Sequence, residues 1–127
     1  MDTIQKEFVD IEKAMVKLFN EKKIDSILEY FSDNFVGFSS TKHERLTKKS
    51  QLKKTFLHYL GEREKVKYSI KSIKVDVLGE CTVTSFYWQV DIHKKKKVKI
   101  LNGRASHLYL QEGDDWKIVH EHFSKAH

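Results

Sequence analysis

The chain has 127 residues, of which 39% are hydrophobic and 33% are charged, and its formal net charge is +6. Its 8 Phe, 5 Tyr and 2 Trp side chains argue against intrinsic disorder. No apolar stretch reaches the roughly 20 residues of a membrane-spanning helix, so we expect no membrane partner. The length fits a single domain over residues 1–127, and the lone Cys81 and the start without a signal-peptide block predict a cytoplasmic protein.

Helices are predicted in the first half of the chain. Residues 3–20 place apolar side chains three or four positions apart, which draws one stripe along a helix, and Asp2 is its expected N-cap. A short second helix follows Asp25. A third helix covers residues 48–60 and ends at Gly61, where a helix C-terminus favours a residue that can adopt positive φ.

Strands are predicted at residues 34–40 and throughout the second half. The alternation of apolar residues changes parity near Ser72, which indicates a β-bulge that curves the sheet. The three strands that follow are expected at residues 82–93, 98–112 and 116–124. Helices that precede strands in this way indicate an α+β fold, with three N-terminal helices packed on a curved mixed or antiparallel sheet. Such a fold leaves a hollow that can hold a ligand.

The excess positive charge is concentrated in the lysines at positions 94–97 and 48–54. A basic surface can attract nucleic acid through counterion release. No recognition-helix, RNP-type or zinc motif accompanies these lysines, so we expect no nucleic-acid partner. The run at positions 94–97 is predicted to form a solvated hairpin tip.

The last two predicted strands resemble those of a known family. Gly-Arg-Ala-Ser-His-Leu-Tyr-Leu at positions 103–110 and Trp-Lys-Ile-Val-His-Glu-His-Phe-Ser at positions 116–124 resemble the ending of SnoaL-like proteins, which have the NTF2-like, or cystatin-like, fold. They are also similar to the association (hub) domain of calcium/calmodulin-dependent kinase, and the match continues through residues 77–80 and 87–89. The resemblance implies a cone-shaped α+β domain. It implies no single reaction, because this fold hosts isomerases, dehydratases, hydrolases and binders without activity.

The resemblance also implies which face of the sheet lies inside the cone. In the hub-like pattern, the positions that match Gln89, His107 and Phe123 point inward. The outer face of the same sheet then carries Phe86, Trp88, Val90 and Ile92. An exposed apolar patch of that size has to be covered, so we expect a homodimer that forms through this face.

His107 and Glu121 form the candidate acid–base pair of the cone. If the last hairpin closes with Glu112 opposite Trp116, His107 lies opposite Glu121, within reach of a hydrogen bond. A neighbouring carboxylate favours the imidazolium and burial opposes it, so the imidazole is expected to titrate near neutrality. The ligand-binding residues expected around this pair are Tyr87, Gln89, Asp91, Tyr109, Val119 and Phe123.

Three functions remain open from the sequence. The first is binding of a small, partly apolar organic molecule in the cone without turnover. The second is acid–base catalysis of the isomerase, dehydratase or hydrolase type by His107 and Glu121. The third is an assembly or polyanion-binding scaffold, which we expect if Tyr87, Tyr109, Phe123 and Phe35 fill the hollow.

At two places the sequence differs from that of its relatives, and each difference argues against one of their functions. The positions that match the arginines of hub-type cones carry Gln89, His107 and Phe123, so an arginine-built anion pocket is not expected. The segment that matches the catalytic carboxylate of ketosteroid isomerase relatives is Phe-Ser-Ser at positions 38–40, so isomerase activity does not carry over.

No metal or cofactor is expected. His120 and His122 share one face of a strand, but two ligands alone do not make a metal site. The five glycines are scattered and form no phosphate-binding loop.

Overall fold

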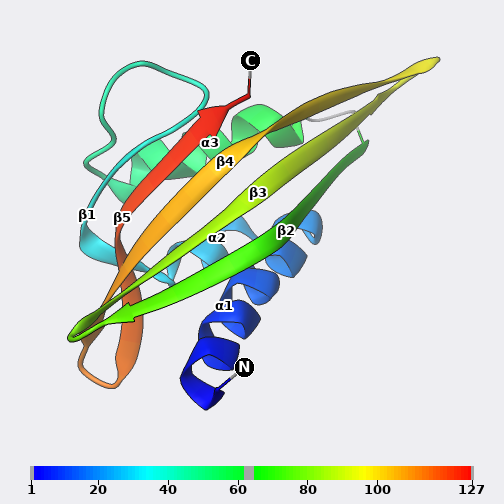
Figure 1. Ribbon diagram of the computed structural model, residues 1–127. Coiled ribbons are helices and arrows are strands. Elements are labelled where there is room, and N and C mark those ends of the chain that lie inside the picture. Colours follow the sequence, from blue (N-terminus) through cyan, green and yellow to red (C-terminus); the bar gives the residue numbers. More distant parts are fainter. Residues whose placement is uncertain (1, 62–64, 127) are drawn as a thin grey trace.

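This computed structural model describes residues 2–61 and 65–126. They contain three helices and one five-stranded sheet (Figure 1). In chain order the elements are α1 (Thr3–Asn20), α2 (Ile24–Leu28), β1 (Phe31–Phe38), α3 (Lys49–Leu60), β2 (Lys65–Leu78), β3 (Cys81–Lys94), β4 (Lys97–Glu112) and β5 (Asp115–Lys125). The strand order is β1-β5-β4-β3-β2, with β1 parallel to β5 and the other neighbours antiparallel. The helices lie on one side of the sheet, which confirms the predicted α+β class.

α1 forms as predicted, because its apolar side chains repeat every three or four residues. It begins after Asp2, whose carboxylate accepts a hydrogen bond from the Gln5 backbone N–H at 2.8 Å. The buried residues of the helix are Phe8, Glu12, Met15 and Phe19. One acidic side chain, Glu12, therefore points with the apolar stripe toward the interior.

Most predicted element boundaries differ from those of the structure by one to three residues, and the C-terminal end of α3 is confirmed. The N-cap of α2 is Lys23, so Asp25 lies within the first turn and not before it. β1 begins at Phe31, earlier than predicted, because Phe31 pairs with Ile118 of β5 and both side chains are buried. α3 ends at Gly61 as predicted, and the φ of this glycine is +32°.

Bulges bend the antiparallel part of the sheet at two places. The β2–β3 register shifts between Lys71 and Lys74, and Ser72 has a φ of +56°, which confirms the bulge predicted near Ser72. The β4–β5 register shifts between Leu108 and Tyr109, with Val119 as the extra residue of β5. Bulges increase the bend and twist of a sheet, and the sheet is strongly twisted in Figure 1.

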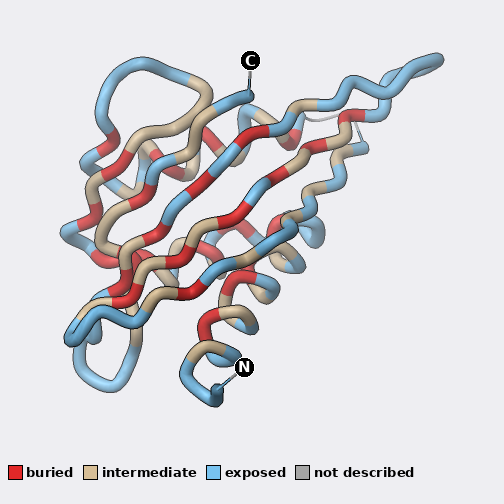
Figure 2. The backbone as a smooth tube through the Cα atoms, viewed as in Figure 1, coloured by how far each residue is buried: buried red, intermediate tan, exposed pale blue. Residues whose placement is uncertain are grey.

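The apolar face of β3 lies inside the domain, whereas the resemblance placed it outside. Thr84 of this face pairs with His107 of β4, so the two side chains share one side of the sheet. The large buried side chains of β3 are Phe86, Trp88, Val90 and Ile92. Side chains of the same chain, including Tyr59 of α3, cover them, and Figure 2 shows the alternation of burial along the strands. The predicted homodimer through this face is therefore wrong.

Gly103 gives the Trp88 indole the space that it occupies against β4. A Cβ atom at Gly103 would lie 1.9 Å from the Ser124 carbonyl oxygen and 2.8 Å from the indole ring. Only a residue without a side chain fits between these groups. This close packing holds the ring of Trp88 against β4. The same ring lines the larger of the two cavities between the helices and the sheet.

Candidate functional site

Three ionisable side chains form a continuous hydrogen-bonded chain in the interior. Glu12 comes from α1, His107 from β4 and Glu121 from β5. The His107 Nδ1 atom lies 2.7 Å from Glu12 Oε2, and the His107 Nε2 atom lies 2.7 Å from Glu121 Oε2. The three residues are only 2%, 4% and 3% exposed, in that order, so water contributes little to their solvation. We call them the Glu–His–Glu chain.

Glu12 is the most heavily hydrogen-bonded member of the Glu–His–Glu chain. Besides His107, its Oε2 atom accepts hydrogen bonds from Thr84 Oγ1 at 2.6 Å and from Tyr109 Oη at 2.7 Å. Glu121 accepts one side-chain hydrogen bond among the described residues, from His107. Because both carboxylates are acceptors, both ring nitrogens of His107 donate, which is the imidazolium form.

The pKa of His107 reflects these two carboxylates. Burial by itself lowers this pKa, but the charge of Glu12 and the hydrogen bonds to Glu12 and Glu121 outweigh burial and raise it from 6.5 to about 10. The expectation of titration near neutrality is therefore wrong, because it counted one carboxylate and the structure has two. With its pKa raised to about 10, His107 stays charged at neutral pH and cannot act there as the base that accepts a proton.

Tyr109 lies beside the chain as a neutral hydrogen-bond donor. Burial, with a smaller contribution from the charge of Glu12, raises the pKa of Tyr109 well above its usual value. Its ring packs against Phe8 with the centroids 5.0 Å apart. The predicted location of Tyr109 next to His107 is therefore correct, but its hydroxyl is engaged by Glu12.

The pairing of His107 with Glu121 is confirmed, although the hairpin closes differently. Glu112 pairs with Asp115, one position away from the expected partner, Trp116. The extra residue at Val119 then shifts the register by one and brings Glu121 opposite His107. Two departures from the predicted register therefore cancel at the site.

Glu12 was not predicted as a site residue, although its position in the sequence indicates that its side chain is buried. It lies four residues after Phe8 and three before Met15, within the apolar stripe of α1. A glutamate at such a position is rarely buried without a partner. The position indicates a buried polar contact, but it does not identify His107 as the partner.

The predicted ligand-binding residues divide between the two faces of the sheet. Phe123 lies inside, with its ring centroid 6.0 Å from that of His107. Tyr87, Gln89 and Asp91 lie on the outer face, and Tyr87 is 53% exposed. Their expected inward orientation is wrong, because the register of β3 places its even-numbered residues on the side of His107.

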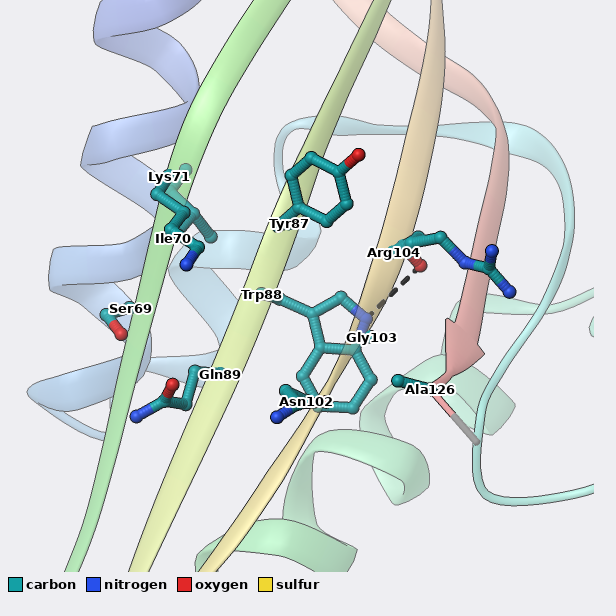
Figure 3. Close-up of a pocket in the computed structure, with 10 residues that line it drawn as sticks. All are labelled: Ser69, Ile70, Lys71, Tyr87, Trp88, Gln89, Asn102, Gly103, Arg104 and Ala126. Atoms are coloured by element: carbon teal, nitrogen blue, oxygen red, sulfur yellow. Dashed lines mark hydrogen bonds between the residues drawn. The ribbon is translucent and has the colours of Figure 1, made fainter.

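The outer face has a hollow of its own, which Figure 3 shows. Its volume is about 590 Å³, and Tyr87, Gln89 and Arg104 are among the residues that line it. The indole N–H of Trp88 donates to the Arg104 carbonyl oxygen at 3.2 Å. This hollow lies on the side of the sheet that faces away from the Glu–His–Glu chain.

Two small adjacent cavities lie inside the cone, between the helices and the sheet. Their volumes are about 50 Å³ and 30 Å³. Both are lined by Phe19, Phe56, Tyr68, Glu121 and Phe123. A water molecule takes about 30 Å³ in the liquid, so the cavities have space for only a few water-sized groups. Buried rings such as Phe31, Phe35 and Tyr109 pack in the interior around the cavities.

The larger cavity extends from Glu121 toward β1 and α3. Its far end is lined by the half-buried Ser39, Ser40 and Tyr59. The smaller cavity reaches Glu12 and His107. Glu121 is the member of the Glu–His–Glu chain that lines both.

No cluster of three His, Cys, Asp or Glu side chains in the described part of the chain could hold a metal ion. His120 and His122 lie near the ring of Phe38, at centroid distances of 6.5 and 5.7 Å. None of the described helices combines the length and apolar character needed to cross a membrane.

Solved structures define the class of fold. An NTF2-like protein of unknown function from Pseudomonas putida matches with a TM-score of 0.84 and 17% identity, over 98% of this chain and 88% of that one. The CaMKII hub of S. rosetta matches with a TM-score of 0.82 and 15% identity, over 99% of both chains. The β subunit of benzoate 1,2-dioxygenase from Burkholderia mallei matches with a TM-score of 0.78 and 16% identity, over 99% of this chain and 93% of that one.

These matches establish an NTF2-like, or cystatin-like, fold, as the resemblance implied. The model of the SnoaL-like domain family matches residues 10–127, so the chain belongs to that family. No curated protein matches the sequence.

Proposed function

We propose that this domain binds a small, partly apolar organic molecule inside the cone and that Glu121 is the polar group that contacts it. The observation that carries the proposal is the position of Glu121, which lines both cavities and accepts a side-chain hydrogen bond only from His107 among the described residues. A carboxylate has further lone pairs for a ligand. The cavity volumes of about 50 and 30 Å³ restrict the ligand to a few non-hydrogen atoms.

A substitution that fills the larger cavity tests this proposal. Val90 lines that cavity, and Val90→Ile adds one methyl group to it. Amide chemical shifts measured against alcohols, ketones and amines of up to about four non-hydrogen atoms should change saturably around Glu121 and Phe123. Val90→Ile should weaken this binding several-fold.

Val75→Ile is the matched control, since Val75 is buried but lines neither cavity. It should leave the affinity unchanged. Absence of binding to the parent protein, or equal affinity in the parent and Val90→Ile, would show that the cone is not a ligand site.

Acid–base catalysis is a second candidate, which the 2.7 Å contact between His107 and Glu121 favours. The charged imidazole fixes the carboxylate at the cavity, where Glu121 is placed to act as the general base. His107 then positions Glu121 and does not itself exchange a proton with the ligand. Hydrogen exchange from a small ketone in D₂O should be faster with the parent than with Glu121→Gln, and equal rates would exclude this candidate.

We also propose that the chain associates with copies of itself through the outer face of the sheet. The exposed apolar side chains on that face include Tyr87, Val98, Ile100 and Leu110. A kinase hub is among the proteins with this fold. Light scattering at micromolar concentration should give at least twice the monomer mass, and Ile100→Glu should reduce it. A monomeric mass for the parent would refute self-association.

A further inference from the structure

The walls of the larger cavity offer aromatic rings and hydrogen-bond acceptors. The rings belong to Phe19, Phe56, Tyr59, Tyr68, Trp88 and Phe123. The polar side chains are the carboxylate of Glu121, which can only accept when ionised, and several hydroxyl groups, which can donate or accept. The indole N–H of Trp88 already donates to the Arg104 carbonyl oxygen. The hydroxyl groups suit a donor or an acceptor equally, so Glu121 sets the preference: a ligand that donates hydrogen bonds fits beside this carboxylate better than a ligand that only accepts them.

The acidic groups of the site also favour a ligand that donates hydrogen bonds. The Glu–His–Glu chain pairs one basic side chain, His107, with two acidic ones, Glu12 and Glu121, so its acidic groups outnumber its basic groups by one. No lysine or arginine lines either cavity among the described residues. An uncompensated buried charge is unfavourable, and a cation in the adjacent cavity would balance it.

We propose that the molecule held in the cone is a small alkylammonium ion, an inference that rests on the binding function proposed above. Its N–H groups donate to the free lone pairs of Glu121, and its alkyl group lies among the aromatic rings. Aromatic rings attract ammonium groups through their quadrupoles, and this attraction is stronger where water is excluded. The volume of about 50 Å³ selects the smallest members of the class, such as ethylammonium.

Other ligands of the same size fit less well. An anion such as acetate would lie against the Glu121 carboxylate, and both ring N–H groups of the nearby His107 imidazolium already donate to Glu12 and Glu121. A neutral alcohol such as ethanol can donate one hydrogen bond to the carboxylate, but it leaves the negative charge uncompensated. The order of affinity expected is therefore ethylammonium above ethanol, and ethanol above acetate.

Titrations of the whole chain with ethylammonium, ethanol and acetate, followed by amide chemical shifts, test this order. The parent should bind ethylammonium at least tenfold more tightly than ethanol. Glu121→Gln should abolish the preference for the cation. Glu80→Gln is the matched control, since Glu80 lies exposed in the β2–β3 turn, and it should retain the preference.

A second variant tests the rings without altering the charge. Phe123→Leu removes one ring beside Glu121 and should weaken ethylammonium more than ethanol. Equal affinities of the parent for ethylammonium and ethanol, or an unchanged preference in a folded Glu121→Gln, would overturn the assignment of a cation while leaving a ligand site in the cone. Absence of binding by all three molecules would overturn both proposals.

Discussion

Glu12→Gln should lower the free energy of unfolding by about 3–5 kcal/mol, the range found when one partner of a buried ion pair is removed. The Glu12 Oε2 atom accepts hydrogen bonds from Thr84, His107 and Tyr109, and all of these groups are inside the domain. A neutral amide cannot balance the imidazolium, and its NH₂ group cannot accept from these donors. Urea unfolding measures the loss, which corresponds to a fall of roughly 10–20 °C in Tm.

Glu7→Gln is the matched control for this prediction. Glu7 lies on the same helix but is exposed, so its replacement should change the free energy of unfolding by less than about 0.5 kcal/mol. Similar small effects of the two substitutions would mean that Glu12 does not stabilise the domain through the three donors.

The second large effect is a loss of stability at alkaline pH that depends on His107. The pKa of His107 in the folded protein is raised from 6.5 to about 10, so the folded state binds this proton more tightly than the unfolded state. The resulting stabilisation is complete below pH 6.5 and is lost as the pH rises from 6.5 to about 10. Its size is on the order of a few kcal/mol, since each pKa unit corresponds to about 1.4 kcal/mol.

Urea unfolding at several pH values between 6 and 10 measures this loss, and the comparison with His107→Gln isolates it. The parent should lose more stability over this interval than His107→Gln. His43→Gln, at an exposed histidine, should behave like the parent. Identical pH dependence in the parent and His107→Gln would contradict the raised pKa.

Local patterns predicted most of the fold. The apolar side chains of α1 recur every three or four residues, and Asp2 caps the helix. Both features depend only on residues that are close in the sequence, so they could be predicted. The parity change in β2 predicted the bulge at Ser72. The early start of β1 was not predictable in this way, because Phe31 is held by Ile118, far away in the sequence.

The faces of β3 show a conflict between two kinds of reasoning. Hydrophobic alternation alone places Phe86 and Trp88 in the core, as the structure does. The comparison with hub-like proteins gave the opposite parity for this strand. Burial of large apolar side chains is the stronger physical constraint, since a shift by one residue would expose every one of them.

The candidate site was predictable where it depends on one hairpin and not where it depends on distant contacts. His107 and Glu121 lie on adjacent strands, so strand pairing brought them together. Glu12 reaches His107 from α1, and no local rule specifies how that helix crosses the sheet. The error in the expected pKa of His107 followed directly from the missing carboxylate.

The protonation state of His107 is the central claim, and it can be observed directly. Nitrogen-15 NMR of the imidazole between pH 5 and 9 distinguishes a ring that carries protons on both nitrogens from a neutral ring. With Glu12 and Glu121 both in contact, His107 should remain doubly protonated across this range. Loss of one ring proton with a midpoint near pH 6.5 would show that the two carboxylates do not hold the charge, and the account of the cone would be wrong.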